Sequence, residues 1–167
     1  AGVLIDTALA QPEIWNVIGF VDKMPWEETV LRFKIKKLGS DEELDAILNK
    51  HPKAKLVIGV GSISRRNKII SSLSFPEDKW ANLIHPSAII ASTVRLSYGI
   101  VVMSRAIIQT GSVVSEHAIV NNGVVIEHDV FIGKNTHIAS GAVLGGGCNI
   151  GNNCTIGLGS RIRDHVS

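Results

Sequence analysis

An aliphatic residue recurs at every sixth position of the C-terminal half of the chain, without a break. The fourteen positions are Ile84, Ile90, Leu96, Val102, Ile108, Val114, Val120, Ile126, Ile132, Ile138, Leu144, Ile150, Ile156 and Ile162. The residue two places before each of them is small or medium in size, and only Asn82 and Ile100 depart from this rule. A period of six is not helical, although it is a multiple of the two-residue period of a strand. It is typical of a chain that runs straight for a few residues, turns a corner and repeats.

Three such sides would form one 18-residue coil of a triangular prism, which is a parallel β-helix of hexapeptide repeats. One aliphatic side chain per side points inward, and residues 18 apart stack at about 4.8 Å, the spacing of neighbouring strands. Glycine often follows the aliphatic residue, as at Gly133, Gly145, Gly151 and Gly157, and we expect it to relax the backbone at the corner. Stacked aliphatic side chains then fill an interior that is too narrow for aromatic rings.

The chain before the repeat alternates helical and strand patterns. Ala1–Ala10 and Ser62–Leu73 are predicted helices, while Asn16–Val21 and Lys55–Val60 are predicted buried strands. Another helix is predicted to begin at Ser40, because a glutamate three residues later completes a capping box. Alternating strands and helices indicate a small parallel sheet with helices packed against it.

We therefore expect two domains, a truncated Rossmann-like α/β domain over residues 1–80 and the β-helix over residues 81–167. Ligands of parallel α/β sheets bind beyond the carboxyl ends of the strands. Asp22, Lys23 and Gly61 follow the two predicted strands, so they are candidates for a ligand site, although each is also an ordinary turn residue.

The composition agrees with a strand-rich fold that has no aromatic core. Ile and Val supply 39 of the 167 residues, whereas aromatic residues make up 5%. A net charge of +2 gives no electrostatic reason to expect nucleic acid or a membrane surface as a partner. No apolar stretch is long enough to span a membrane, and no secretory signal is visible. Two cysteines are too few for a disulfide scaffold, so we expect a reducing, cytoplasmic location.

Both ends of the chain suggest that residues are missing. The chain begins without Met and directly in a helix, and it stops at Ser167 in the middle of a repeat. Solenoids need capping units at their ends, so we expect further coils after Ser167 and a first strand before Ala1.

Three of the six histidines, His117, His128 and His137, lie within the repeat and outside the inward aliphatic positions. We expect all three to face outward or to lie at corners. His128 has the strongest chemical context, because Glu127 precedes it and Asp129 follows it. A carboxylate beside an imidazole can orient it, fix its tautomer and raise its basicity. Strict alternation would separate neighbouring side chains, but alternation fails at a corner.

His137 follows His128 by nine residues, which is half a coil. The two histidines therefore lie on opposite sides of one prism and can share a site only between two prisms. A three-fold arrangement with a groove between neighbours would bring them together. This spacing predicts a homotrimer with active sites between its subunits.

A metal site is one alternative interpretation, because outward histidines at prism interfaces bind zinc in trimeric hexapeptide carbonic anhydrases. The residues that accompany the zinc ligands in that family are not visible here, and we expect no metal. The other histidines, His51, His85 and His165, are expected to be loop, structural and terminal residues. Small residues dominate the corners after His137, including Gly141, Gly145, Gly146, Gly147, Gly157 and Gly159. Bare backbone there would let a long, thin ligand lie along the prism.

The order of these segments resembles a known family. The chain reads GFVDK, KLGSDEEL, VIGVGSISRRNKI and LIHPSAIIASTV, followed by VNNGVVIEHDVFIGKNTHIASGAVLGGG and CNIGNNCTIGLGS. This is similar to the hexapeptide-repeat acetyltransferases of sialic acid O-acetylation and of bacterial UDP-4-amino-sugar N-acetylation. The resemblance covers essentially the whole chain, and its most specific part is the EHD–IG–N–HIASGA segment. It implies a left-handed β-helix, a trimer, acetyl-CoA as co-substrate and a sugar acceptor.

The resemblance also implies roles for individual residues. His128 matches the general base, Asp129 its acidic neighbour, and His137 the histidine that contacts acetyl-CoA. Gly146 and Leu158 match backbone contacts along acetyl-CoA.

For the acceptor, Asp22, Lys23 and Gly61 match positions at the nucleotide-sugar site, although some relatives carry two acids where this chain has Asp22-Lys23. The glycine-rich loop with a histidine that follows the first strand of the family would precede Ala1. Cys148 and Cys154 occupy small inward positions, where packing is the expected role, so we expect direct transfer without an acyl-enzyme.

The leading hypothesis is acetyl transfer to the amino group of a nucleotide-linked 4-amino sugar. Acetylation of a hydroxyl group, on sialic acid or another sugar, is a close alternative, although the amine is the better nucleophile. A non-catalytic scaffold that binds a nucleotide sugar or a protein partner is an alternative of another class. Retained binding of acetyl-CoA would separate the enzyme from the scaffold.

Overall fold

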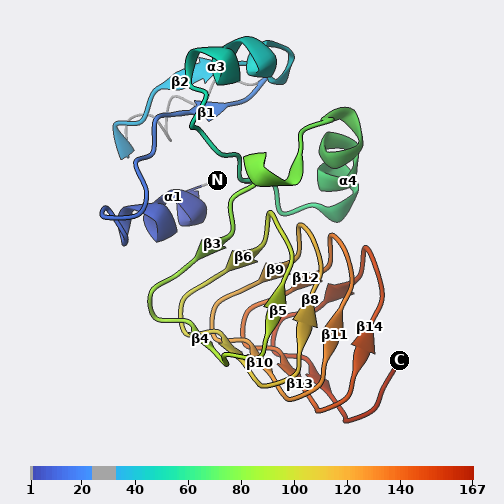
Figure 1. Ribbon diagram of the computed structural model, residues 1–167. Helices are drawn as coiled ribbons and strands as arrows, with labels where there is room; N and C mark the ends of the chain where they lie inside the picture. Colours follow the sequence, from blue (N-terminus) through green and yellow to red (C-terminus); the bar gives the residue numbers. More distant parts are fainter. Residues whose placement is uncertain (1, 24–32) are drawn as a thin grey trace.

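The computed structural model describes residues 2–23 and 33–167, and its C-terminal part is the predicted prism (Figure 1). Fourteen strands of two residues each are separated by corners. They are β3 (Leu83–Ile84), β4 (Ile89–Ile90), β5 (Arg95–Leu96), β6 (Val101–Val102), β7 (Ile107–Ile108), β8 (Val113–Val114), β9 (Ile119–Val120), β10 (Val125–Ile126), β11 (Phe131–Ile132), β12 (His137–Ile138), β13 (Val143–Leu144), β14 (Asn149–Ile150), β15 (Thr155–Ile156) and β16 (Arg161–Ile162).

These strands form the three faces of the triangular coil. The first sheet holds β3, β6, β9, β12 and β15; the second holds β4, β7, β10, β13 and β16; and the third holds β5, β8, β11 and β14. All pairs are parallel, and the paired residues are 18 positions apart, as Val125 and Val143 are. The predicted coil length is therefore confirmed.

The fourteen aliphatic residues of the six-residue repeat, called the aliphatic ladder below, point into the prism. Ile126, Ile132 and Ile138 have no exposed surface, while ladder residues at the two ends of the prism, such as Ile84 and Ile162, are half-buried. Asn82 is one of the two exceptions among the small residues that stand two places before each aliphatic residue, and its presence has a physical reason. The amide oxygen of Asn82 accepts a hydrogen bond from the Ile100 N–H at 2.9 Å, and its amide nitrogen donates to the Ser97 carbonyl at 2.6 Å. Asn82 thus braces a corner between successive coils.

The corners are made differently from our expectation. From Gly99 to His165, every sixth residue has a positive φ between 54° and 74°. These residues are Gly99, Arg105, Gly111, His117, Gly123, Asp129, Asn135, Gly141, Gly147, Asn153, Gly159 and His165. They lie three places after the aliphatic residue, so the prediction that glycine directly after it relaxes the corner was wrong. Gly133 is needed for a different reason, because an added Cβ would lie 2.5 Å from the backbone of Gly151 in the next coil.

Replacing Gly133 by alanine is therefore expected to lower the free energy of unfolding by about 1–3 kcal/mol, the usual cost of overpacking a rigid interior. Urea denaturation would measure the loss. Gly151→Ala is the matched control, because Gly151 holds the same repeat position and an added Cβ would lie at an ordinary 3.8 Å from the Cys154 sulfur. Equal stability of the two variants would contradict the packing argument.

The N-terminal part contains α1 (Gly2–Leu9), β1 (Phe20–Val21), β2 (Lys37–Gly39), the short 3-10 helix η1 (Asp41–Glu43), α3 (Leu44–Lys50), α4 (Ile63–Ser72) and a second 3-10 turn, η2 (Glu77–Lys79). Strands β1 and β2 pair in parallel, as an α/β unit requires. The predicted helix start at Ser40 is confirmed, because the Glu43 carboxylate accepts a hydrogen bond from the Ser40 N–H at 2.8 Å.

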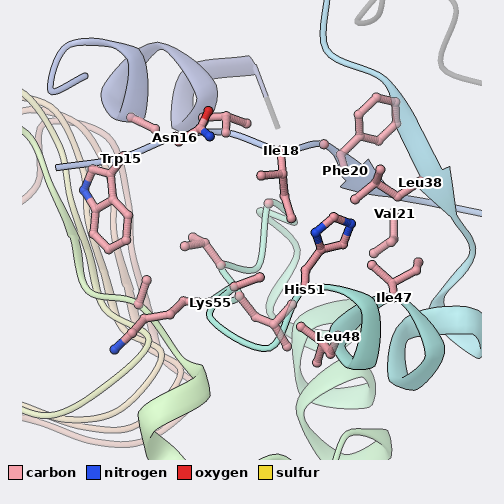
Figure 2. Close-up of a pocket in the computed structure, with 18 of the residues that line it drawn as sticks. Trp15, Asn16, Ile18, Phe20, Val21, Leu38, Ile47, Leu48, His51 and Lys55 are labelled. Carbon is pink, nitrogen blue, oxygen red and sulfur yellow. The ribbon is translucent and has the colours of Figure 1, made fainter. Parts of the chain in front are cut away.

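Two strand predictions in this part were wrong in extent. Only Phe20–Val21 of the predicted strand Asn16–Val21 is paired, and Lys55–Val60 contributes only one isolated bridge, between Leu56 and Trp80. A largely apolar cavity of about 850 Å³ separates these two segments (Figure 2). No strand of the described residues lies between the two segments. The backbone groups that face the cavity therefore form no strand-to-strand hydrogen bonds across it.

The N-terminal part packs against the outer surface of the first sheet. Val101, Met103 and Ile119 point outward from the prism and are buried against Leu4 and Val57. The apolar part of the covered area ends at β9, so the next strand of this sheet, β12, lies at its margin. The fold thus places the outward residue of β12 where the two parts of the chain meet.

Candidate active site

His128 and Asp129 form a dyad at the corner that follows β10. The Asp129 backbone is left-handed, with φ of 57°, which turns two neighbouring side chains toward one another. The His128 Nδ1 and the Asp129 Oδ2 lie 2.9 Å apart, and both side chains are more than half exposed. The expectation that alternation fails at this corner is confirmed. A proton shared on Nδ1 leaves Nε2 as the nitrogen available to a substrate.

Glycines in the adjacent coils make room for this dyad. An added Cβ on Gly146 would lie 2.7 Å from the His128 Nε2, and one on Gly111 would overlap the Asp129 Oδ1. The Asp129 N–H also donates to the Thr110 carbonyl at 2.9 Å, which ties the corner to the coil below. The imidazole therefore lies over the backbone of Gly146, so these two predicted site residues occupy one place on the prism.

His137 is the outward residue of β12, half-buried at the junction with the N-terminal part. Its Nε2 lies 3.3 Å from the amide nitrogen of Asn121. Burial and the nearby Arg66 guanidinium lower the pKa of His137, while a backbone hydrogen bond with Gly61 opposes that shift. His137, Asn121 and Gly61 also line a small cavity of about 130 Å³ whose other walls are mainly apolar. The structure thus brings together two predicted residues, Gly61 and His137, that the resemblance had placed on different ligands.

Asp22 and Lys23 lie elsewhere. Asp22 lines the large apolar cavity rather than the small one, and its N–H donates to the Gly39 carbonyl at 3.1 Å. The Lys23 ammonium forms an exposed ion pair with Glu42 at 3.1 Å, and the hydrogen bond and charge of that carboxylate raise the pKa of Lys23. The three predicted acceptor residues are therefore not gathered in one cavity.

The second sheet lies between two corners that carry predicted site residues. His128 and Gly146 are at the corner between the second and third sheets, while Leu158, which is 79% exposed, is at the corner between the first and second. Four of the five outward side chains of this sheet form an apolar row, which consists of Ile89, Ile107, Val125 and Val143; the fifth, on β16, is Arg161. Of these, Ile89 is 63% exposed. Within the described residues nothing covers this row, in contrast to the first sheet.

His117 corrects the expectation of an outward-facing side chain. It lies at a corner as predicted, but only 3% of it is exposed. Its ring contacts Trp80 and Tyr98 edge to face, with centroids 4.7 Å and 5.3 Å away. Its carbonyl accepts a hydrogen bond from the buried Arg66 of α4. His117 therefore anchors the N-terminal part on the prism, and burial together with Arg66 lowers its pKa to about 4.

This burial predicts a pH dependence of stability. The unfolded imidazole takes up a proton near pH 6.5, whereas folded His117 resists protonation down to about pH 4. The unfolded state thus binds more protons in that window, and the free energy of unfolding falls as the pH falls through it, by on the order of 2 kcal/mol. Urea denaturation at pH 7 and pH 4.5 measures this loss. His117→Asn, which suits a left-handed corner, should flatten the dependence; an unchanged slope would assign it to other groups.

The remaining candidates have no visible chemistry. His51 is exposed, the His85 Nδ1 accepts a hydrogen bond from the Ser87 N–H at 3.1 Å, and His165 is exposed in the last coil. Cys148 is buried in the ladder core, and Cys154 packs against it, as expected for small inward positions. Among residues 2–23 and 33–167 no group of three His, Cys, Asp or Glu side chains is arranged to hold a metal ion. The same residues include no helix long and apolar enough to cross a membrane.

Two polar residues near the predicted histidines were not predicted from the sequence. Asn121 contacts His137 from the preceding coil, and Arg66 contacts the His117 backbone from α4. The sequence gives a weak signal for Asn121, because it lies 16 residues before His137 and so falls close to it one coil earlier. It gives no signal for Arg66, whose helix is placed only by tertiary packing.

Two known families match separate parts of the chain. The PglD N-terminal domain matches residues 1–73, and the bacterial transferase hexapeptide family (six repeats) matches residues 129–164. A comparison with curated proteins gives no match.

Solved structures extend the similarity to nearly the whole chain. PerB from Caulobacter crescentus, in complex with CoA and GDP-perosamine, is 25% identical with a TM-score of 0.71, over 98% of this chain and 86% of PerB. The acetyltransferase domain of PglB from Neisseria gonorrhoeae is 25% identical with a TM-score of 0.76, over 99% of this chain and 87% of that one. The same domain in complex with acetyl coenzyme A gives a TM-score of 0.74 at 25% identity, over 98% and 87%.

The prism and these matches together define a hexapeptide-repeat acyltransferase whose coil is a left-handed parallel β-helix. More narrowly, the two matched parts, a PglD N-terminal domain and hexapeptide repeats, agree with the resemblance of the sequence to sugar acetyltransferases.

Proposed function

We propose that this chain transfers the acetyl group of acetyl-CoA to the amino group of a nucleotide-linked 4-amino sugar, with His128 as general base. The observation that carries the proposal is the His128–Asp129 dyad, with Nδ1 bonded to the carboxylate and Nε2 beside the Gly146 backbone. Within residues 2–23 and 33–167, Nε2 has no hydrogen-bond partner. A base needs this combination of one fixed nitrogen and one free nitrogen.

The chemistry follows from this geometry. Nε2 of His128 takes a proton from the acceptor amine as the amine nitrogen attacks the acetyl carbonyl carbon. The carbon–sulfur bond of the thioester breaks, and the imidazolium returns the proton to the CoA sulfur. Asp129 holds the imidazole and stabilises its cationic form while the proton is held. No acyl-enzyme is required, in keeping with the packing role of both cysteines.

The proposed acceptor is supported by PerB, which binds GDP-perosamine, a nucleotide amino sugar. An amine is also the easier nucleophile for a single base to activate. In the same proposal, Asp22, Lys23 and Gly61 contact the nucleotide sugar from separate places, while His137, Gly146 and Leu158 lie along acetyl-CoA. The reaction takes place in the cytoplasm, where acetyl-CoA is found.

The proposed assembly is a homotrimer with one site at each interface. His128 lies at a corner of the second sheet and His137 lies on the first sheet, so one prism cannot bring them together. The uncovered apolar row on the second sheet gives a neighbouring prism a surface to pack against. Light scattering coupled to size exclusion would measure the mass, and a monomer would exclude this arrangement.

An acceptor screen tests the function directly. The protein is incubated with acetyl-CoA and UDP- or GDP-linked 4-amino sugars, with sialic acid as the hydroxyl acceptor, and the released thiol is measured. Release with an amino sugar supports the proposal, whereas release with sialic acid alone would favour O-acetylation. Binding of acetyl-CoA in a thermal shift without release on any acceptor would contradict the proposed acceptor class. Absence of both would favour the scaffold.

The shared site can be tested by complementation. Equal amounts of His128→Ala and His137→Ala chains are unfolded together and refolded as mixed trimers. About a quarter of the interfaces then combine an intact His128 with an intact His137, so activity should return to about a quarter of that of the parent protein. No recovery above the separate variants would place both histidines in sites within one chain.

A further inference from the structure

Asn121 has an orientation that its own backbone neighbour determines. It directly follows β9, and its amide oxygen accepts a hydrogen bond from the Asn122 N–H at 2.8 Å. A backbone N–H can only donate, so the atom that faces it must be the oxygen. The amide nitrogen is therefore the atom 3.3 Å from the His137 Nε2.

This orientation decides which nitrogen of His137 carries the proton. The amide nitrogen of Asn121 has only hydrogens to offer, so the His137 Nε2 must accept with its lone pair. A neutral imidazole then has its proton on Nδ1. Gly61 of the N-terminal part lines the same small cavity as His137 and Asn121.

The charged surroundings favour the same form. Arg66 of α4 is the charged group whose field reaches the ring, and together with burial it disfavours the imidazolium. Protonation at Nε2 would also set two donors, the ring N–H and the Asn121 amide, against each other. Rotating that amide would break its bond to the Asn122 N–H.

We propose that Asn121 is a positioning residue that fixes His137 as the Nδ1–H tautomer, in the cavity where Gly61 of the N-terminal part meets the prism. Gly61 precedes Ser62, the N-cap residue of α4, so this cavity lies between the start of that helix and β12. The inference rests on the proposed function only in its kinetic consequence, which is alignment of the acceptor.

Nitrogen NMR of protein labelled with 15N-histidine tests the tautomer without any substrate. The signals of His137 are assigned by their loss in His137→Gln. We expect a pyrrole-like Nδ1 and a pyridine-like Nε2 at pH 7.5 in the parent protein. Asn121→Asp offers Nε2 a carboxylate acceptor, so its Nε2 signal should become pyrrole-like. A pyrrole-like Nε2 in the parent protein would overturn the proposal.

Asn122→Ala is the matched control, because it removes an exposed side chain and keeps the backbone N–H that holds Asn121. It should leave the His137 signals in place. Asn121→Asp and Asn121→Ala should each raise KM for the acceptor by about tenfold, the effect of one lost hydrogen bond. Equal effects of Asn122→Ala on the spectrum would contradict a specific role of Asn121. A parent spectrum as expected with no turnover on any acceptor would reject the proposed function alone.

Discussion

Replacing His128 by alanine is expected to lower kcat for acetyl transfer by about 10²–10⁴-fold, the usual contribution of a positioned general base. The fold should survive, because the side chain is more than half exposed and its neighbour Gly146 gains only free space. CoA release with the best acceptor of the screen measures the effect. KM for acetyl-CoA should change little, since the imidazole acts on the acceptor.

His85→Ala is the control for this experiment, because His85 lies at the corner after β3 and its Nδ1 accepts a hydrogen bond from the Ser87 N–H. It should keep the activity of the parent protein. Asp129→Asn should fall between the two, because it leaves the base in place but removes the charge that holds the imidazole. Undiminished turnover of His128→Ala would falsify the base assignment.

Replacing Gly111 by alanine is expected to lower kcat by about 10- to 100-fold, although Gly111 touches no substrate. Its added Cβ would occupy the space of the Asp129 Oδ1 and push the carboxylate away from the His128 Nδ1. A shift of about 1 Å in a catalytic group can lower the rate by about 100-fold. The double variant Gly111→Ala with Asp129→Asn should be no slower than Asp129→Asn, because the carboxylate has then lost its role already.

Gly123→Ala separates this effect from backbone strain. Gly123 and Gly111 hold equivalent corners, with φ of 63° and 74°, but an added Cβ on Gly123 meets nothing within 4 Å. Both variants bear a similar cost of about 1–2 kcal/mol for a side chain in the left-handed region. They should therefore lose similar stability, while only Gly111→Ala loses activity. Equal kcat values in the two variants would show that Asp129 is held by something other than this glycine.

The inward positions of the aliphatic ladder could be predicted from the sequence, because they depend only on the six-residue spacing along the chain. Ile126 and Ile132 are inward for the same reason as every other sixth residue, and one repeat predicts the next. The His128–Asp129 dyad was readable for a similar reason, since its two members are adjacent and a corner was expected there. The corner residue itself was misplaced, because a glycine pattern does not distinguish positive φ at Gly141 from the close packing at Gly133.

Contacts between the N-terminal part and the prism could not be predicted from the sequence. His117 looked like an exposed corner residue, and only the approach of Trp80 and Arg66 buries it. Gly61 and His137 lie 76 positions apart in the sequence, and no periodicity relates them. The strand predicted at Lys55–Val60 had the right hydrophobicity, but a strand also needs a neighbour with which to pair, which a single segment cannot reveal.

The prism has a six-residue repeat, which places the inward side chains, and an 18-residue coil, which places the outward ones. The two set different rules for changes in chain length. Removing one hexad would keep every aliphatic side chain inward, so the helix would still close on itself. If that hexad came from between Asp129 and His137, however, His137 would move into the place of Phe131, on the third sheet. Only the loss or gain of 18 residues returns each outward side chain to its own face. Natural length variation in this segment should therefore come in whole coils, since the architecture accepts steps of six whereas the chemistry accepts only steps of eighteen.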